Sequence, residues 1–524
     1  MGEHNRQGNN NKHETRDALT QIKASSAGIY VFLMLVAFVF YSPERYVYIG
    51  NHKIAFFEKT TGLFLVVSLI LLIVSLVKQT ISKEKIRFSL SYTEIALLIY
   101  GAWNLISFAF SSYKKGAVFG YGGWHTGLYM QLSLIAVFFA VRRWSDKKEF
   151  FLKLAASVLI IECAMVIIQR LGFDPFGYYK GMGFMDWNRR NLLGTIGNTN
   201  WLMGYEITVI PVLIWLYISA KEVFDRIVWG IGCFITVSAV FLQDAGSGIV
   251  AMSVILLFLF AVYIKDAEKL ARILEIVCMI FLFWSILSVF HVKLIEPEEK
   301  DTSQYYTYLW LVPVVILGLA IGFLYFYMKK KGKKMPKNFV DIVRAGMVTG
   351  IMFAVGLFFA IQFSDGLWAA LGSKSSLRLS DASGSFRILL WKQTIRHYIF
   401  DSGIKDFIFG VGPDSFGYWY ETKHIVIPQV GGPFIDAIYT NAHNDFLTTV
   451  VNLGIPGAVI FFAVFLSMAA KQDNDKEWAM ACIITVIAYV INNVFSFQQV
   501  CSTPVFFVIM ALLLTPKNKT LQKQ

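Results

Sequence analysis

Charged residues are scarce in this sequence, and their scarcity argues against a soluble protein. Only 16% of its 524 residues are Asp, Glu, Lys or Arg, whereas 56% are hydrophobic. A soluble globular domain is about one quarter charged and less apolar than this chain. Apolar runs long enough to cross a bilayer recur along the whole length, so the sequence predicts a polytopic membrane protein.

The sequence also lacks the patterns of disulfide-rich and metal-binding proteins. Its five cysteines lie in or at the edge of apolar runs and form no CxxC pair. No cluster of His, Glu and Asp has metal-ligand spacing, and neither an HExxH sequence nor a Walker motif occurs. We therefore expect neither a disulfide framework nor a zinc site.

Signals for processing or for separate domains are missing as well. No cleavable signal peptide is expected, because the first apolar run begins near Ala27 after a polar tail and no small-residue cleavage site follows. No soluble domain, internal repeat or low-complexity segment stands out. We therefore predict an all-α fold, a polytopic transmembrane helix bundle of about 12–14 spans with one long, partly helical extracytoplasmic loop.

Fourteen segments are candidate spans, because each approaches the roughly twenty mostly apolar residues that a bilayer requires. They centre on 27–42, 60–78, 90–110, 126–141, 150–169, 200–219, 226–243, 247–264, 273–291, 308–328, 342–363, 443–468, 478–497 and 502–515. The expected parts are a disordered cytoplasmic tail (1–25), a transmembrane bundle (26–363), an extracytoplasmic loop (364–440), C-terminal transmembrane helices (441–515) and a cytoplasmic tail (516–524).

Lysine and arginine gather in every second loop, which sets the expected orientation. If the N-terminus is cytoplasmic, the basic loops fall on that side, whereas the acidic run EPEEKD at 296–301 falls outside. We therefore expect a multi-pass protein of the cytoplasmic (inner) membrane with both termini inside. The net charge of +13 then reflects topology, and no nucleic-acid partner is expected.

Three segments on the outer side are long or polar enough to carry a function: 111–125, 170–199 and 364–440. The third is by far the longest and is rich in aromatic residues, so we expect it to be ordered. Long ordered loops in compact proteins are usually functional. The active site is therefore expected on the extracytoplasmic face.

Arg387 lies in the sequence GSFRILLWKQTIRHYIF, whose apolar spacing is typical of an amphipathic helix. Ser383 or Ser385 could cap this helix, which would place Arg387 in its first turn. A helix N-terminus attracts anions, and the arginine fork matches phosphate oxygens. The pattern fits a diphosphate clamp, and it also fits an interfacial helix whose arginine contacts lipid headgroups.

His443 lies in YTNAHNDFLTTVV, where Thr440 or Asn441 could cap the next spanning helix. In the first turn, the positive helix end would keep the imidazole neutral near pH 7, so that it could accept a proton. A neutral imidazole at an outer cavity is a candidate general base. The alternative is a polar residue that only caps the helix at the membrane surface.

A third candidate is the segment WNRRNLLGTIGNTN at 187–200. Arg189 and Arg190 lie on the outer side, against the positive-inside trend, and so call for an anionic partner. Asn198 and Asn200 could hydrogen-bond a sugar or phosphate, or simply cap the loop. Buried acids in spans are functional candidates by default, and Glu162 could serve a proton path or an ion pair between helices.

Together these residues resemble a known family. GSFRILLW, FGVGPDSF and NAHNDFLTTVVNLGIPG, in this order between two spans, resemble the signature domain of the O-antigen ligase and polymerase superfamily, and GTIGNTNWLMGY resembles its Gly-Asn-x-Asn segment. The resemblance implies a membrane glycosyltransferase whose donor is a glycan on undecaprenyl diphosphate and whose acceptor is a glycan, lipid or protein. It further implies that no metal or other cofactor is needed and that the anomeric centre is inverted.

In that family, an arginine matching Arg387 is thought to hold the donor diphosphate, and a histidine matching His443 is thought to activate the acceptor hydroxyl. We expect Arg189, Arg190, Asn198, Asn200, Trp391, Asn441 and Asn444 to bind substrate beside them. The chain departs from the family at Asn452, where a Glu is usual. Ligase and polymerase activities both remain open, and a lipid-linked glycan flippase is the alternative from another class.

Overall fold

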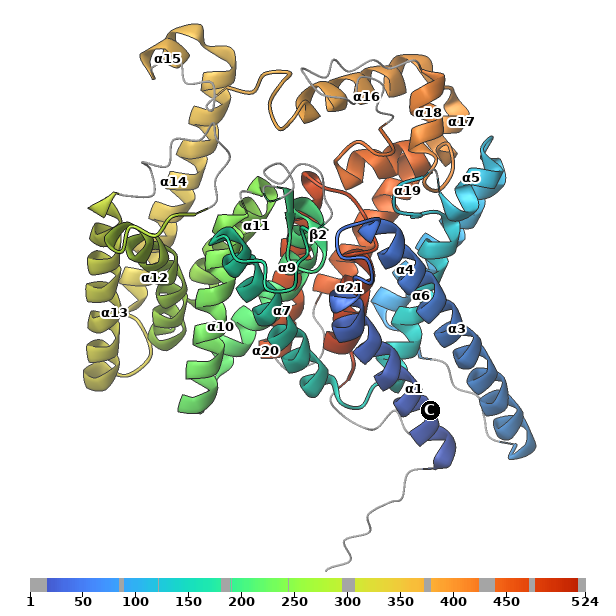
Figure 1. The fold of residues 1–524 in the computed structure, drawn as a ribbon, viewed down its shortest axis with the longest axis horizontal. Helices are drawn as coiled ribbons and strands as arrows, with labels where there is room; N and C mark the ends of the chain where they lie inside the picture. The colour runs from blue at the N-terminus through green and yellow to red at the C-terminus, as the bar shows by residue number, and fades with distance from the viewer. Residues whose placement is uncertain are drawn as a thin grey trace, which may run out of the picture.

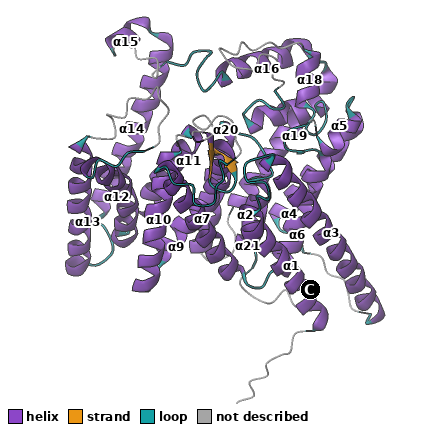
Figure 2. Ribbon diagram, in the orientation of Figure 1, coloured by secondary structure: helices purple, strands orange, loops and turns teal. Residues whose placement is uncertain are grey.

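A computed structural model of the chain describes residues 17–83, 89–120, 122–180, 189, 191–243, 245–294, 307–371, 378–423, 439–470 and 476–516. Helices make up 77% of this described part (Figures 1 and 2), and its one sheet pairs β1 (Leu192–Leu193) with β2 (Gly197–Asn198). The helices before the long loop are α1 (Ala18–Phe32), η1 (Leu33–Ala37), α2 (Phe38–Phe40), α3 (Ile49–Ile81), α4 (Tyr92–Phe110), α5 (Lys114–Phe119), α6 (Leu128–Trp144), α7 (Lys148–Arg170), α9 (Thr199–Ser219), α10 (Val223–Leu242), α11 (Gly246–Tyr263), α12 (Ala267–Val289), η3 (Tyr308–Trp310), α13 (Leu311–Lys331) and α14 (Lys337–Phe363). Those of the loop and the C-terminal part are α15 (Asp365–Ala370), α16 (Arg387–Asp401), α17 (Ile404–Phe409), α18 (Phe416–Thr422), α19 (Asp445–Ala469), α20 (Lys476–Val494) and α21 (Thr503–Leu513).

The predicted fold class is confirmed. Within the described residues, 12 helices are long and apolar enough to span a membrane. The two remaining expected spans are also helical, as α6 with 17 residues and α21 with 11. The helices alternate in direction, so the short helices α15 to α18 of the long loop share one end of the bundle (Figure 1). Which end faces the cytoplasm stays a prediction.

The N-terminal helix begins earlier than expected. Residues 18–25, assigned to a disordered tail, form the first turns of α1. Asp17 precedes this helix and forms an ion pair with Lys78 of α3, with 2.8 Å between Nζ and Oδ2. Lys23 lies over the ring of Trp144, 5.7 Å from its centroid. These contacts with other helices extend the helix into a sequence whose polarity alone favours a tail; residues 1–16 lie outside the described part.

Burial separates a central helix from two peripheral ones. In α9, 89% of the spanning window is buried, because α7, α10, α11 and α20 all pack against this helix. The windows of α13 and α14 are 6% and 0% buried, and both are apolar. Apolar helix surface that other protein segments do not cover is stable only in lipid. The two helices therefore form a lipid-facing edge of the bundle (Figure 1).

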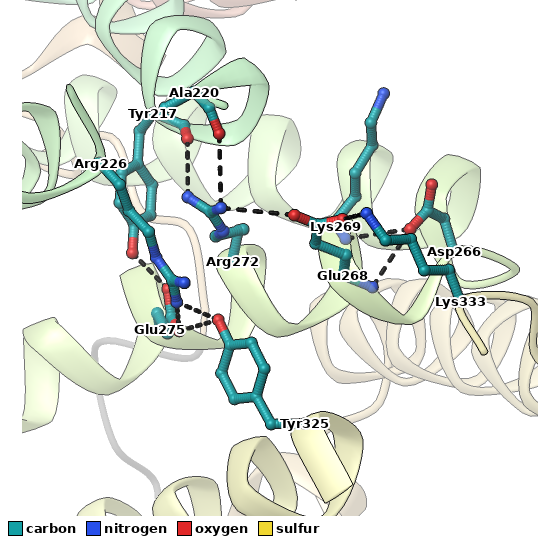
Figure 3. Close-up of polar contacts among 10 residues, drawn as sticks. All are labelled: Tyr217, Ala220, Arg226, Asp266, Glu268, Lys269, Arg272, Glu275, Tyr325 and Lys333. Atoms are coloured by element: carbon teal, nitrogen blue, oxygen red, sulfur yellow. Dashed lines mark hydrogen bonds and ion pairs between the residues drawn. The ribbon is translucent and has the colours of Figure 1, made fainter. Parts of the chain in front are cut away.

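A polar cluster fastens α13 to the bundle (Figure 3). Glu275 of α12 lies at its centre, where its carboxylate pairs with Arg226 of α10 at 2.9 Å and accepts a hydrogen bond from Tyr325 of α13 at 2.6 Å. Tyr217 of α9 donates to the same carboxylate. A second ion pair joins Lys333, just after α13, to Glu268 of α12. This cluster joins α13 to three other helices at one end of the bundle.

We predict that Glu275→Ala lowers the melting temperature of the protein in detergent. The substitution leaves the half-buried Arg226 and two tyrosine hydroxyls without their acceptor, at a cost of about 1–3 kcal/mol. Differential scanning fluorimetry checks this, with Glu149→Ala as a control on the surface at the same end of the bundle. Equal melting temperatures for the two variants would contradict the anchoring role of Glu275.

Candidate active site

The site is organised by a break in α19. At Gly454 the backbone leaves the helical region, with φ 73° and ψ 175°, and Pro456 follows two residues later. Proline has no N–H to bond the carbonyl four residues before it, so carbonyl groups just before the break need other donors. Four donors from outside the helix serve them: the N–H of Val411 bonds Val451 O, the N–H of Gly412 and the hydroxyl of Ser107 bond Asn452 O, and the indole of Trp103 bonds Leu453 O, at 2.9–3.1 Å.

Glycines allow the loop at 410–415 to lie directly against this break. A Cβ on Gly410, whose φ is 71°, would come within 2.3 Å of Asn452 O. A Cβ on Gly454 would come equally close to the carbonyl oxygen of Ile408, at 2.3 Å. The side chain of Asn452 then accepts the N–H of Ser415 at 3.1 Å. Asn452, where the chain departs from the family pattern, thus fastens the FGVGPDSF turn to α19.

His443 lies just before α19 and not in its first turn. The N-cap is Asn444, whose Oδ1 accepts the N–H of Leu447 at 2.9 Å, so neither Thr440 nor Asn441 caps the helix as expected. Asn441 instead accepts the N–H of His443 at 2.9 Å. This tight turn gives His443 a φ of 49°, and its half-buried ring lies edge-on to Phe497 at 5.1 Å. In the described part of the chain, its imidazole forms no hydrogen bond.

Arg387 is the first residue of α16, and Phe386 with φ 65° precedes it as N-cap without a capping side chain. The expected serine caps are wrong, because Ser383 accepts the N–H of Ser380 at 2.9 Å and Ser385 itself takes a φ of 56°. Within the described residues, the half-buried guanidinium of Arg387 has no carboxylate or hydrogen-bond partner.

Trp391 joins the arginine helix to the histidine turn. One turn after Arg387, its indole N–H donates to the carbonyl of Ala442 at 2.9 Å. Ala442 immediately precedes His443, so this bond sets α16 against the backbone that carries the imidazole. We expected Trp391 to bind substrate; its contacts within the described residues include this hydrogen bond and a tilted ring contact with Phe495 at 6.2 Å.

Electrostatics couple the two residues. Burial and, to a smaller extent, the positive charge of Arg387 together lower the pKa of His443 to about 4. Burial also lowers the pKa of the Arg387 guanidinium. The imidazole is therefore neutral at physiological pH. The expected cause was the helix terminus, whereas the structure assigns the effect to burial first and to Arg387 second.

A polar cavity opens beside the histidine turn, and sequence reasoning missed its two carboxyl groups. Its lining comes from α4, α6, α19 and the loops around them: Tyr100, Asn104, Gly122, Trp124, Thr126, Gln131, Pro413, Asp414, Thr440, Asn441, Asp445, Thr448, Thr449, Asn452, Leu453, Phe497 and Gln498. Asp414 accepts the N–H of Thr126 at 2.9 Å, and burial raises its pKa to about 8. Asp445 accepts from Asn493 at 3.3 Å. The sequence feature that could have identified Asp414 and Asp445 is their position in the FGVGPDSF and NAHND motifs.

The GTIGN segment forms a separate, tightly held turn before α9. Asn198 caps α9 by accepting the N–H of Asn200 at 2.9 Å. Glu162 of α7 holds the turn between β1 and β2. Its carboxylate accepts hydrogen bonds from the N–H of Thr195 at 2.5 Å and from the hydroxyl of Thr195 at 2.9 Å. Glu162 thus orients this turn through hydrogen bonds with its backbone and side chain.

The predicted site residues fall into two groups. Arg387, Trp391, Asn441, His443 and Asn444 come together, whereas Arg189, Asn198 and Asn200 belong to the turn before α9. Arg189 lies over the ring of Tyr179 at 5.6 Å, and Arg190 lies outside the described residues.

One aromatic contact connects the second group with the cavity. Trp201 of α9 meets Trp124 of the cavity wall edge-on at 4.4 Å. Direct contact between Arg189 and either Arg387 or His443 is not seen in the described ranges. The described residues also contain no group of three or more His, Cys, Asp or Glu that could hold a metal ion.

We predict that Gly410→Ala destabilises the protein and abolishes its activity, because a Cβ there meets Asn452 O and the positive φ alone costs about 1–3 kcal/mol. Gly403→Ala is the matched control, since it precedes α17 with nothing within 4 Å of its added Cβ. Melting temperatures of the two purified variants check this. A Gly410→Ala protein as stable as the control would show that the loop does not rest on the break in α19.

Part of the chain matches a known protein family. Residues 311–462, from the start of α13 into the second half of α19, match the family model described as O-antigen ligase. No curated protein matches the chain. The matched range contains Arg387, Trp391, Asp414 and His443, and it excludes the GTIGN turn.

Proposed function

Through residues 311–462 this chain belongs to the O-antigen ligase family, and we propose that it transfers an undecaprenyl-diphosphate-linked glycan to an acceptor hydroxyl on the outer face of the cytoplasmic membrane. At the coarser level, the family is one of glycosyltransferase-like membrane enzymes with lipid-linked glycan and acceptor partners. The donor, the transfer reaction and the side of the membrane are the parts proposed here.

One observation carries the proposal: Arg387 is half-buried, has no carboxylate partner among the described residues, and lies close enough to the neutral His443 to lower the pKa of its imidazole. A buried cation without a partner is costly, so a site that keeps one is built for an anionic ligand. A diphosphate suits the arginine fork, since guanidinium can donate two parallel hydrogen bonds to phosphate oxygens. The neutral imidazole beside it can accept a proton.

In the proposed reaction, the acceptor hydroxyl attacks the anomeric carbon of the donor sugar while His443 takes the hydroxyl proton. The new C–O bond forms as the bond from that carbon to the diphosphate oxygen breaks. Undecaprenyl diphosphate leaves with the bonding electrons, and Arg387 stabilises the charge that develops on it. Attack opposite the leaving group inverts the anomeric centre. Arg189 and Arg190 would hold a more distant part of the donor.

The same two residues would also couple donor binding to basicity. A cation beside an imidazole disfavours its protonated form, which is one of the two reasons for the low pKa of His443. A bound diphosphate would neutralise that cation and so raise the pKa of the imidazole. His443 would therefore become a better base once the donor is in place.

A polymerase, which uses a second lipid-linked glycan as acceptor, would need the same arrangement. Loss of the gene separates the two activities: short single repeat units on the cell surface indicate a polymerase, and long unattached polymer indicates a ligase. A flippase is disfavoured because Arg387 and His443 lie outside the spanning helices, whereas transporters place their binding groups near the membrane midplane.

We predict that His443→Ala lowers glycan transfer by about 10²–10⁴-fold, the usual contribution of a general base. Release of undecaprenyl diphosphate from a lipid-linked oligosaccharide by purified protein is the measurement. His397→Ala is the matched control, because that histidine of α16 pairs with Asp401 away from the cavity. Transfer by His443→Ala at the wild-type rate would remove the base assignment.

Arg387→Ala should weaken use of the donor by about 10²–10³-fold, because the developing charge on the leaving diphosphate loses its partner. Arg396→Ala, an exposed arginine on the same helix, should transfer normally. Initial rates over a range of donor concentrations distinguish the two variants. An unchanged kcat/KM for the donor in Arg387→Ala would exclude the diphosphate clamp.

The pH dependence of kcat and of kcat/KM should show the coupling between donor binding at Arg387 and the pKa of His443. In the free enzyme His443 is protonated only below a pKa of about 4, so kcat/KM for the donor should fall only as the pH drops towards that value. With donor bound, the pKa is higher, so the acid limb of kcat should lie at higher pH than that of kcat/KM. Acid limbs at the same pH would show that the arginine and the histidine are not coupled through the donor.

A further inference from the structure

The cavity beside His443 contains a buried acceptor atom without a partner. Asn104 of α4 is fully buried, and its amide nitrogen donates to the carbonyl of Tyr100 at 2.9 Å. This bond fixes the orientation of the amide, and its Oδ1 is left without a hydrogen bond in the described part of the protein. A buried oxygen of this kind costs about 1–3 kcal/mol unless a ligand or water donates to it. Because Asn104 lines the cavity, the missing donor belongs there.

Asp414 provides a second acceptor on the cavity wall. Its side chain is 8% exposed, and its described hydrogen-bond partners both belong to Thr126. A carboxyl group has more hydrogen-bonding positions than these two partners use, whether it is protonated or ionised, so it can still bond a group in the cavity. Gly120 fits closely around this group, since a Cβ there would lie 2.0 Å from Oδ2. The carboxyl is therefore held in one position on the cavity wall.

Hydrogen bonds hold the rest of the wall in place. Gln131 donates to Thr126 O and to Gln498 Oε1, both at 2.9 Å, and accepts from the hydroxyl of Tyr100 at 3.1 Å. Trp124 adds an aromatic surface. Two carboxyl groups and, among the described residues, no lysine or arginine line the cavity. The cavity therefore offers a phosphate or a carboxylate no compensating positive charge. Amide, hydroxyl, carboxyl and indole groups together suit the hydroxyl-bearing faces of a sugar.

The cavity is also adjacent to the proposed base. Asn441 and Phe497 both line it, and both contact His443: Asn441 accepts its backbone N–H, and Phe497 lies against its ring. Asp445, another lining residue, follows two positions later in the chain. A sugar in this cavity would therefore lie next to the turn that carries the imidazole.

We propose that this cavity is the acceptor subsite and that it takes an uncharged, hydroxyl-rich sugar ring, with Asn104 and Asp414 accepting hydrogen bonds from its hydroxyl groups. This inference rests on the transferase function proposed above and names the acceptor class for it. It divides the substrates by charge: the anionic diphosphate of the donor lies at Arg387, and the neutral acceptor lies between the two carboxyl groups. Acceptors that carry a carboxylate or phosphate on the reacting sugar are rejected.

The test uses purified full-length protein, a lipid-linked oligosaccharide donor and two soluble acceptors, methyl β-glucoside and methyl β-glucuronide. Each is offered as an acceptor and as a competitor, at pH 9.5, above the pKa of about 8 that burial gives the Asp414 carboxyl. Wild-type protein should use or bind the glucoside at least about tenfold better, because a carboxylate in the cavity would face like charge. Equal use of the two glycosides, or preference for the glucuronide, would overturn the proposal.

Two variants identify the residues. Asp414→Asn keeps the shape and an oxygen for Thr126 but removes the charge, so it should narrow the preference for the glucoside by about tenfold. A misfolded protein cannot produce such a change in selectivity. Asp406→Asn, in the nearby helix α17 and outside the cavity, is the control and should keep the wild-type ratio.

Asn104→Ala should raise the KM for the glucoside about tenfold while the KM for the donor stays unchanged. Its melting temperature should equal or exceed that of wild type, because alanine favours the helix and the unpartnered oxygen is gone. An Asn104→Ala protein that is less stable and has a normal acceptor KM would assign Asn104 to the fold alone and overturn its role here.

The proposed transferase function and the proposed acceptor subsite are tested by different results. If wild-type protein releases no undecaprenyl diphosphate from the donor under any condition, the proposed transferase function is wrong. If it releases the carrier and transfers glycan, but neither selectivity nor acceptor KM responds to the two substitutions, then the function stands and the acceptor subsite is wrong.

Discussion

The interrupted helix α19 is the constraint on which the site depends. A spanning helix can break in a membrane only where other groups satisfy its backbone, because no water is available to do so. Here the loop after α17 and two side chains of α4 satisfy the carbonyl groups before Gly454. The same bonds fasten the FGVGPDSF turn, and hence Asp414, to the head of α19, while Asn444 caps that head beside His443. One backbone defect therefore assembles residues that lie far apart in the sequence.

The polar groups on the two sides of the histidine turn differ in kind. Arg387 enters from the long loop as a cation without a carboxylate partner in the described residues, and Trp391 fixes its helix against the histidine turn. In the described structure, the cavity next to that turn is lined by carboxyl and amide groups, and no basic residue is among its lining residues. An anionic leaving group and a neutral nucleophile would thus approach the imidazole from environments of opposite character. The low pKa of His443 results from the burial that this arrangement requires and from the neighbouring cation.

Patterns repeated over many residues could be interpreted from the sequence, and single local geometries could not. Hydropathy located the helices because each span carries about twenty apolar residues. The capping residues predicted for α16 and α19 are wrong. Several Ser, Thr and Asn residues near the start of each helix can bond the same N–H groups, and tertiary contacts decide among them. Asp414 and Asp445 were missed because their significance comes from the cavity, which is formed by residues from α4, α6 and α19. The expected neutrality of His443 rested on a helix dipole, whereas burial and Arg387 produce it.

The most direct test of the central claim is a cryo-electron microscopy structure of the protein in a lipid nanodisc with an undecaprenyl-diphosphate-linked oligosaccharide bound. We predict that the diphosphate binds the guanidinium of Arg387 and that the anomeric carbon lies between the diphosphate and the imidazole of His443. A donor whose diphosphate lies at the turn before α9, away from Arg387, would contradict it.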